Sequence, residues 1–177
     1  MSATRREFFD PEELIDGAAR RVEETRFRGE RIDYLTLVPD GEPTLDVNIG
    51  KLIDGVKKLG IPVALITNAS LMSHAVLREE LQPLDWISVK VDAADEATWR
   101  KTDRPHKSID FSRMMTGIRT FAEGFEGTFT TESMLIQGLN DSREQIDALV
   151  SMIESLEPAK AYLSIPTRPP AESWAVP

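Results

Sequence analysis

The sequence contains no cysteine, and this absence excludes several kinds of site at once. Without a thiol the chain can form no disulfide and can bind no metal through thiolate ligands. Only two histidines are present, His74 and His106, and they lie too far apart in the sequence to show the spacing of a metal-binding motif. No residue is therefore predicted to ligate a metal.

Long apolar segments and excess positive charge are also missing. No run approaches the roughly 18 apolar residues of a membrane span, and the N-terminus lacks the apolar core of a signal peptide. The expected location is the cytoplasm. The net charge of −9 disfavours an extended surface for nucleic-acid phosphates, so nucleic acid is not a favoured partner and the substrate stays unknown.

What the sequence does contain is ordinary for one globular domain over residues 1–177, with 41% hydrophobic and 29% charged residues. Helical and strand patterns alternate along the chain, which predicts an α/β fold in which a parallel sheet is connected by helical crossovers. Right-handed crossovers would curl this sheet toward a partial or complete barrel. The expected helices cover residues 11–22, 49–59, 73–81, 95–101, 111–121 and 142–156, and the expected strands cover residues 32–38, 61–66, 86–91, 128–136 and 161–165. The chain begins with a helix, so a first strand is expected to be missing.

Polar motifs follow the first two predicted strands. Asp40-Gly41-Glu42-Pro43 comes after the strand at 32–38, and Asn68 follows the strand at 61–66. The carboxyl ends of parallel strands are where ligands bind in such folds, and a glycine beside an acidic residue lets the backbone approach a ligand closely. The first motif could instead be a plain turn between strand and helix. Its sequence alone supports a ligand-binding turn and a plain turn equally well.

The third strand carries polar residues within its own pattern. Ser88, Lys90 and Asp92 share one face because side chains alternate along a strand. A lysine and an aspartate on the inner face of a sheet are costly unless they are paired or line a cavity. The sequence therefore predicts either a polar cavity or a structural ion pair of Lys90 with Asp92 or Glu132.

Further candidates lie toward the C-terminus. Glu132 shares a face of its strand with Met134 and Ile136, and the segment that follows ends in Asn140-Asp141, which is better explained as a helix cap than as a ligand contact. Asp141 or Ser142 is expected to cap the next helix. Arg168 lies beyond the last strand, where it could meet an anionic group; a solvated arginine is an equally good interpretation.

Taken together and in this order, the motifs resemble those of radical S-adenosylmethionine (radical SAM) enzymes, in the branch related to wybutosine-type tRNA-modifying proteins. The resemblance covers nearly all of the chain from Ile32 onward. Asp40-Gly41-Glu42-Pro43 is similar to the family's G-G-E-P motif, with aspartate in place of the first glycine. The resemblance implies a partial TIM-like barrel and a site for S-adenosylmethionine (SAM).

The resemblance also implies roles for individual residues. In the family, the G-G-E-P turn holds the amino group of SAM through backbone groups and the acidic side chain, so Gly41 and Glu42 would take that role. Asn68 would line the SAM pocket. The resemblance implies that Ser88, Lys90 and Asp92 approach the ribose and carboxylate of SAM and that Ile136, Gly138 and Leu139 lie in the segment that contacts adenine. Asp40, Pro43, Glu132 and Arg168 are also expected to bind the cofactor.

The sequence departs from the family at its most characteristic point. Radical SAM enzymes bind a [4Fe–4S] cluster through three cysteines spaced C-x3-C-x2-C after the first strand, and this chain has none. We therefore expect a family core without its N-terminal cluster segment, inactive alone and binding SAM weakly; the cluster would belong to a longer parent protein. An expressed fragment, a misassigned start codon and a natural paralogue would all give this sequence.

Loss of the first strand would leave the edge of the strand at 32–38 unpaired. We expect a homodimer at that edge, or its coverage by the N-terminal helix. Two other functions are compatible with the residues. One is a barrel enzyme that uses Lys90 as a Schiff-base nucleophile, with Glu132 or Asp92 as acid and base. The other is a ligand-binding or scaffold protein without catalysis.

Overall fold

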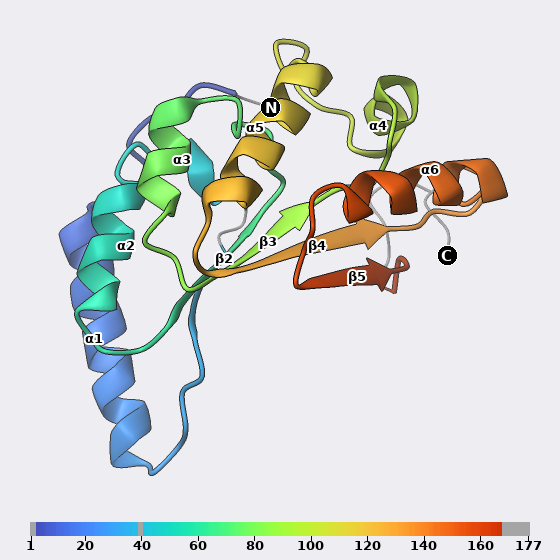
Figure 1. The fold of residues 1–177 in the computed structure, drawn as a ribbon. Coiled ribbons are helices and arrows are strands. Elements are labelled where there is room, and N and C mark those ends of the chain that lie inside the picture. Colours follow the sequence, from blue (N-terminus) through green and yellow to red (C-terminus); the bar gives the residue numbers. More distant parts are fainter. Residues whose placement is uncertain (1–2, 39–40, 168–177) are drawn as a thin grey trace.

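The computed structural model describes residues 3–38 and 41–167 and shows one open parallel sheet with helices on one face (Figure 1). The five strands lie in the order of the sequence, from β1 to β5, and every neighbouring pair is parallel. The α/β class and the parallel sheet predicted from the sequence are thus confirmed. Within residues 3–38 and 41–167, neither β1 nor β5 has a second neighbour in the sheet, which is there a partial barrel rather than a closed one.

The strands are β1 Leu35–Leu37, β2 Val63–Thr67, β3 Trp86–Lys90, β4 Thr128–Met134 and β5 Lys160–Ser164. The helices are α1 Pro11–Phe27, α2 Ile49–Lys57, α3 Ala75–Leu81, α4 Glu96–Thr102, α5 Phe111–Gly124 and α6 Arg143–Glu154, and a 3-10 turn, η1, covers Pro43–Leu45. No helix in this part of the chain is long and apolar enough to cross a membrane.

Local sequence signals explain several helix boundaries. Asp10 caps α1 by accepting a hydrogen bond from the backbone N–H of Glu12, and Pro11 occupies the first turn, as the sequence predicts. Gly60 adopts a φ of 69° just beyond α2, where a left-handed residue ends the helix. Helix α6 begins with a reciprocal capping box between Ser142 and Gln145.

The first strand is shorter than predicted. The first strand was expected over residues 32–38 but covers only Leu35–Leu37, because ladder pairing begins where Leu35 N–H donates to the carbonyl of Pro62. Of the two residues expected to cap α6, Asp141 and Ser142, it is Ser142 that does so, and Asn140 takes no part in the cap. Asn140 instead lies 2% exposed beneath the end of β4.

The core lies between the sheet and its helices. Leu65, Ile87 and Phe129 stand side by side on neighbouring strands and are between 0% and 5% exposed, because the helices cover this face. On the opposite face, which carries no helix in Figure 1, Ile66 is 39% exposed. This uncovered face and the carboxyl ends of the strands are consequently where a ligand could bind.

Candidate ligand site at the carboxyl ends of the strands

The turn after β1 is tied to the end of β2 by the carboxylate of Glu42. Its Oε1 accepts hydrogen bonds from Thr44 N–H (3.1 Å), Thr44 Oγ1 (2.6 Å) and Thr67 Oγ1 (2.6 Å), and its Oε2 accepts one from Asn68 N–H (2.8 Å). A carboxylate offers about four acceptor positions. Oε1 is therefore fully used inside the protein, and Oε2 keeps one position open for a ligand.

The second turn, at Thr67-Asn68-Ala69, has an unusual backbone. Ala69 is buried and has a φ of 60°, a left-handed conformation that costs energy for a residue with a Cβ. The turn is stabilised by the Thr67 hydroxyl, which accepts a hydrogen bond from Ala69 N–H, and by Asn68 Oδ1, which accepts one from Ser70 N–H. The Asn68 side chain is exposed at the edge of the site.

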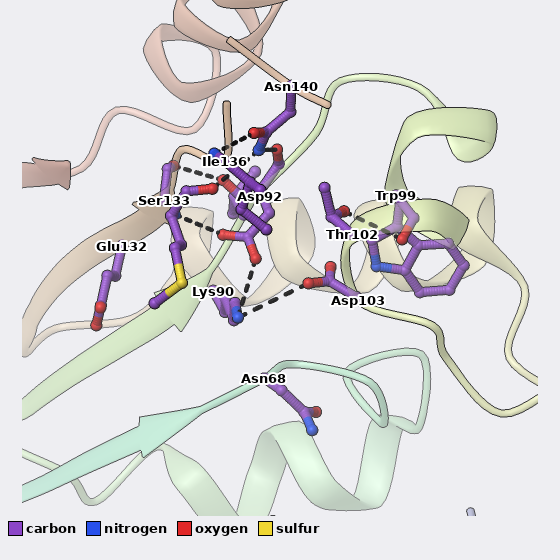
Figure 2. Close-up of polar contacts among 12 residues, drawn as sticks. Asn68, Lys90, Asp92, Trp99, Thr102, Asp103, Glu132, Ser133, Ile136 and Asn140 are labelled. Carbon is purple, nitrogen blue, oxygen red and sulfur yellow. Dashed lines mark hydrogen bonds and ion pairs between the residues drawn. The ribbon is translucent and has the colours of Figure 1, made fainter. Parts of the chain in front are cut away.

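Beyond β3, three ionisable groups meet. Lys90 Nζ lies 3.0 Å from Asp92 Oδ2 and 3.7 Å from Asp103 Oδ1, and Figure 2 shows the two carboxyl groups approaching one ammonium from different elements. Asp92 is 3% exposed, and its Oδ1 also accepts a hydrogen bond from Met134 N–H at 2.9 Å. The Lys90–Asp92 ion pair predicted from the sequence is thus present, and Lys90–Glu132 is not among the ion pairs of the described residues.

Burial and neighbouring charges shift the pKa values of two members of this cluster. Burial lowers the pKa of the Lys90 ammonium, but the charges of Asp92, Asp103 and Glu132 raise it by more, so the net shift is upward. Burial raises the pKa of Asp103 to about 8, with further increases from the hydrogen bond and charge of Asp92 that outweigh the opposing Lys90. The upward shift keeps Lys90 an ammonium at neutral pH, and the raised pKa of Asp103 favours its protonated carboxyl group.

Asn140 fixes the segment after β4 against the end of β3. Its Oδ1 accepts a hydrogen bond from Ile136 N–H (2.7 Å), and its amide donates to the backbone carbonyls of Asp92 and Met134 (2.9 Å each). Figure 2 shows these contacts directly above the Asp92 side chain. The side chain of Asn140 thus holds two polypeptide segments together at the site.

The structure brings some of the predicted site residues together and separates others. Ser88 is buried on β3, and Glu132 stands opposite Lys90 in the β3–β4 register, outside the ion-paired cluster in Figure 2. Ile136 is 7% exposed, so little of it can contact a ligand, whereas Leu139 is half-buried and Gly138 is exposed. Gly41 is exposed and Pro43 begins η1, while Asp40 and Arg168 lie outside the described residues.

Sequence reasoning missed Asp103 and the role of Asn140. Asp103 follows α4 directly, and nothing in its local pattern indicates that this helix brings its carboxyl group onto Lys90. The role of Asn140 was only weakly indicated by the sequence. A polar residue shortly after a strand can hydrogen-bond to nearby backbone groups as easily as it can cap the next helix.

Comparison with known proteins gives the family of this chain. Residues 3–150 match the radical SAM superfamily. The UPF0026 protein MJ1312 of Methanocaldococcus jannaschii is 37% identical over 173 residues, which are 98% of this chain and 53% of that protein. The S-adenosyl-L-methionine-dependent tRNA 4-demethylwyosine synthase of Oryza sativa subsp. japonica is 26% identical over 148 residues, covering 84% of this chain and 20% of that enzyme.

A solved structure agrees with this chain in its fold. The structure of TYW1 with a lysine-pyruvate adduct bound superposes with a TM-score of 0.67 at 18% identity, over 92% of this chain and 57% of that one. This likeness shows a shared fold. The chain spans about half the length of the UPF0026 protein it matches. By its sequence match and its partial barrel, the chain belongs to the radical SAM superfamily.

Proposed function

We propose that this chain is the SAM-binding core of a radical SAM enzyme whose cluster-binding segment is not contained in these 177 residues. The observation that carries the proposal is the convergence of polar groups from four consecutive strands at the carboxyl end of the sheet. The groups are the Glu42-linked turns after β1 and β2, the Lys90–Asp92 pair after β3, and the Asn140-anchored segment after β4.

The two cofactors of the family fit this chain differently. Clusters of the [4Fe–4S] type are held by cysteine thiolates, and a sequence without cysteine offers none of them. SAM has a carboxylate, an ammonium, a sulfonium, a ribose and an adenine, and the site offers groups suited to each. When bound, SAM would supply the 5′-deoxyadenosyl group for hydrogen abstraction from a substrate that is not identified.

Each side of the site would orient a different part of SAM. The open Oε2 position of Glu42 and the backbone of its turn can accept and donate hydrogen bonds to the amino-acid end. Asn68 can hydrogen-bond at the rim, and the ribose can reach Lys90, whose side chain is 38% exposed, whereas Ser88 and Asp92 are buried beside it. The half-buried Leu139, beside the backbone at Gly138, offers an apolar surface to adenine.

A chemical-shift titration of the purified chain with SAM tests the proposal. We expect saturable shifts at the turns after β1 and β2 and at the end of β3, with a dissociation constant weaker than micromolar because no cluster coordinates the ligand. Asn68→Ala is expected to weaken binding about fivefold through the loss of one hydrogen bond. Asn48→Ala is the matched control, because Asn48 precedes α2 and its side chain makes no capping hydrogen bond. Absence of saturable shifts at this edge, or equal losses in both variants, would refute the proposal, and micromolar affinity would refute the expected weakness.

The gene upstream of the Met1 codon gives a second test. An in-frame extension that encodes a strand and a C-x3-C-x2-C motif would support a core belonging to a working radical SAM enzyme. A stop codon close upstream would favour the alternative of a ligand-binding protein without catalysis.

The Schiff-base alternative is less well supported by the environment of Lys90. A lysine nucleophile must be unprotonated, whereas the carboxyl groups of Asp92 and Asp103 keep its pKa above the ordinary value. The lysine-pyruvate adduct of the TYW1 structure still makes a direct test worthwhile. Incubation with pyruvate and borohydride is expected to leave Lys90 unmodified, and a mass increase at Lys90 would reverse this conclusion.

A further inference from the structure

A cavity of about 260 Å³ lies beside the proposed SAM site, between the segment that follows β2 and the segment that precedes α5. Its polar lining consists of three serine hydroxyls, two basic side chains and one carboxyl group (Ser70, Ser73, Ser108, His74, Arg113 and Asp110). Ser70 links the cavity to the SAM site, because its N–H donates a hydrogen bond to Asn68 Oδ1 at 2.9 Å. The contacts proposed for SAM use none of these six side chains.

Close packing between α5 and the segment after β2 fixes the walls of the cavity. Gly117 of α5 lies so near the backbone of Met72 and Ser73 that a Cβ there would overlap it. Arg113 precedes Gly117 by four residues, and side chains four positions apart share one face of a helix. Arg113 therefore projects from the face of α5 that packs on this segment. Arg78 holds the segment from the other side, since its Nη1 donates to the carbonyl of Met72 at 2.8 Å.

The strongest hydrogen-bond donors of the cavity are unused inside the protein. Within residues 3–38 and 41–167, neither the guanidinium of Arg113 nor the ring of His74 has a hydrogen-bond or ion-pair partner. Ser108 Oγ lies 2.8 Å from His106 Nδ1. Asp110 Oδ1 accepts the backbone N–H of Arg113 at 2.8 Å, so this carboxyl group already serves as the cap of α5. The Arg113 guanidinium keeps all five of its N–H donors for a ligand.

This set of donors suits a phosphate group better than a carboxylate. An arginine can bind two phosphate oxygens through parallel hydrogen bonds, and serine hydroxyls and an imidazole can donate to the others. A carboxylate has only two oxygens and would leave part of these donors without a partner. The net charge of −9 does not attract anions from a distance, so binding would depend on contacts within the cavity.

We infer that this cavity binds a phosphate group, either as the free ion or at the end of a phosphomonoester. Arg113 is its main contact, and Ser73 and His74 donate to the remaining oxygens. The inference goes beyond the proposed function, because it assigns a second binding site next to the SAM site. Binding is non-covalent, and no bond is formed or broken.

Chemical-shift titration of the chain with inorganic phosphate, at constant ionic strength and without SAM, tests the inference. We expect saturable shifts of the backbone amides of Ser70, Ser73 and Arg113. Arg113→Gln is expected to weaken phosphate binding about tenfold, because it removes a charge-assisted pair of hydrogen bonds. Arg20→Gln, on the exposed surface of α1, makes the same chemical change away from the cavity and is expected to change the affinity less than twofold.

Ribose 5-phosphate distinguishes the two sources of the phosphate group. Tighter binding than that of inorganic phosphate would identify a phosphomonoester as the ligand, and equal or weaker binding would identify the free ion. Absence of saturable shifts at the cavity, equal losses in Arg113→Gln and Arg20→Gln, or acetate binding as tight as that of phosphate would overturn the inference. Because SAM is absent from these titrations, such results would leave the proposed function standing, and failure of SAM to bind would leave this inference standing.

Discussion

At the scale of single residues, Glu42 joins two turns that are 25 residues apart in the sequence. The resemblance to the G-G-E-P motif indicated a ligand-binding acid, and the structure adds an internal role for the same side chain. The Glu42 carboxylate accepts four hydrogen bonds through its two oxygens. A glutamine amide could not accept all four in the same way, because it has an NH2 donor in place of one oxygen.

Glu42→Gln is therefore expected to destabilise the chain by about 1–3 kcal/mol, because the new NH2 group faces donors instead of receiving their hydrogen bonds. Urea unfolding measures the effect. Glu123→Gln, on the exposed surface of α5, is the matched control and is expected to change the free energy of unfolding by less than about 0.5 kcal/mol. Equal stabilities of the two variants would contradict the role of Glu42.

Asp103 gives a prediction for stability without any ligand. The pKa of Asp103 is about 8 in the folded chain, whereas an unfolded aspartate has a pKa of about 3.9. Between these values the folded state holds a proton that the unfolded state has lost, so the free energy of unfolding falls as the pH rises from about 4 to 8. Above pH 8 this contribution no longer changes.

Urea midpoints measured at one-unit steps from pH 5 to pH 9 test this dependence. Asp103→Asn is expected to flatten the curve between pH 5 and 8, and Asp54→Asn, on the exposed surface of α2, is expected to keep the wild-type slope. The other shifted groups do not interfere: the pKa values of Asp85 and Asp95 are lowered and those of Lys51 and Lys90 are raised, which places their contributions outside this range. A wild-type slope that Asp103→Asn does not reduce would contradict the prediction.

At the scale of elements, α5 packs against the backbone that follows β2. Gly117 lies in the middle of this helix, and a Cβ there would overlap the carbonyl of Met72 and the backbone nitrogen of Ser73. The helix can approach so closely only because residue 117 has no side chain. The contact places α5 directly behind the turn that carries Asn68.

Gly117→Ala is expected to destabilise the chain by about 1–3 kcal/mol, because overpacking outweighs the gain of about 1 kcal/mol in helix propensity. Gly124→Ala, at the end of the same helix, meets no atom within 4 Å and is expected to be neutral or stabilising. Thermal unfolding of the two variants measures the difference, and an unchanged or higher Tm for Gly117→Ala would show that the helix can move away.

These elements also show what a sequence can and cannot predict. The helices and strands were predictable because periodicity and caps such as Asp10-Pro11 are local signals. The faces of β3 were predictable for the same reason, and with them the Lys90–Asp92 pair. The approach of Asp103 to Lys90 and the three backbone contacts of Asn140 depend on how distant segments meet, and no local pattern encodes that arrangement.

At the scale of the whole molecule, the sheet has two open edges. Helix α1 packs against α2, where Ile15 meets Gly55, and the described residues show no hydrogen bond from α1 to β1. At the other edge, Leu163 of β5 is 64% exposed, and Ile165, directly after the strand, is 52% exposed. An edge strand with unpaired backbone N–H and C=O groups is a template for pairing with another chain.

We therefore expect self-association through β1, measurable as a dimer by light scattering. Leu35 N–H points toward β2, so the N–H of Thr36 points outward, and Thr36→Pro removes an outward donor without breaking the ladder. This variant is expected to be monomeric, whereas Thr36→Val, which keeps the N–H, is expected to remain dimeric. A monomeric wild type would refute the expectation, and a dimer that survives Thr36→Pro but is lost in Leu163→Lys would place the interface at β5.

The Glu42 carboxylate has a kinetic consequence as well. Because one side chain holds both turns, neither can detach from the sheet edge while the other stays in place. The amides of Thr44 and Asn68 would then exchange with solvent deuterium in the same opening event and at the same rate, although they belong to different connections. A ligand arriving at this edge meets two loops that open and close as one.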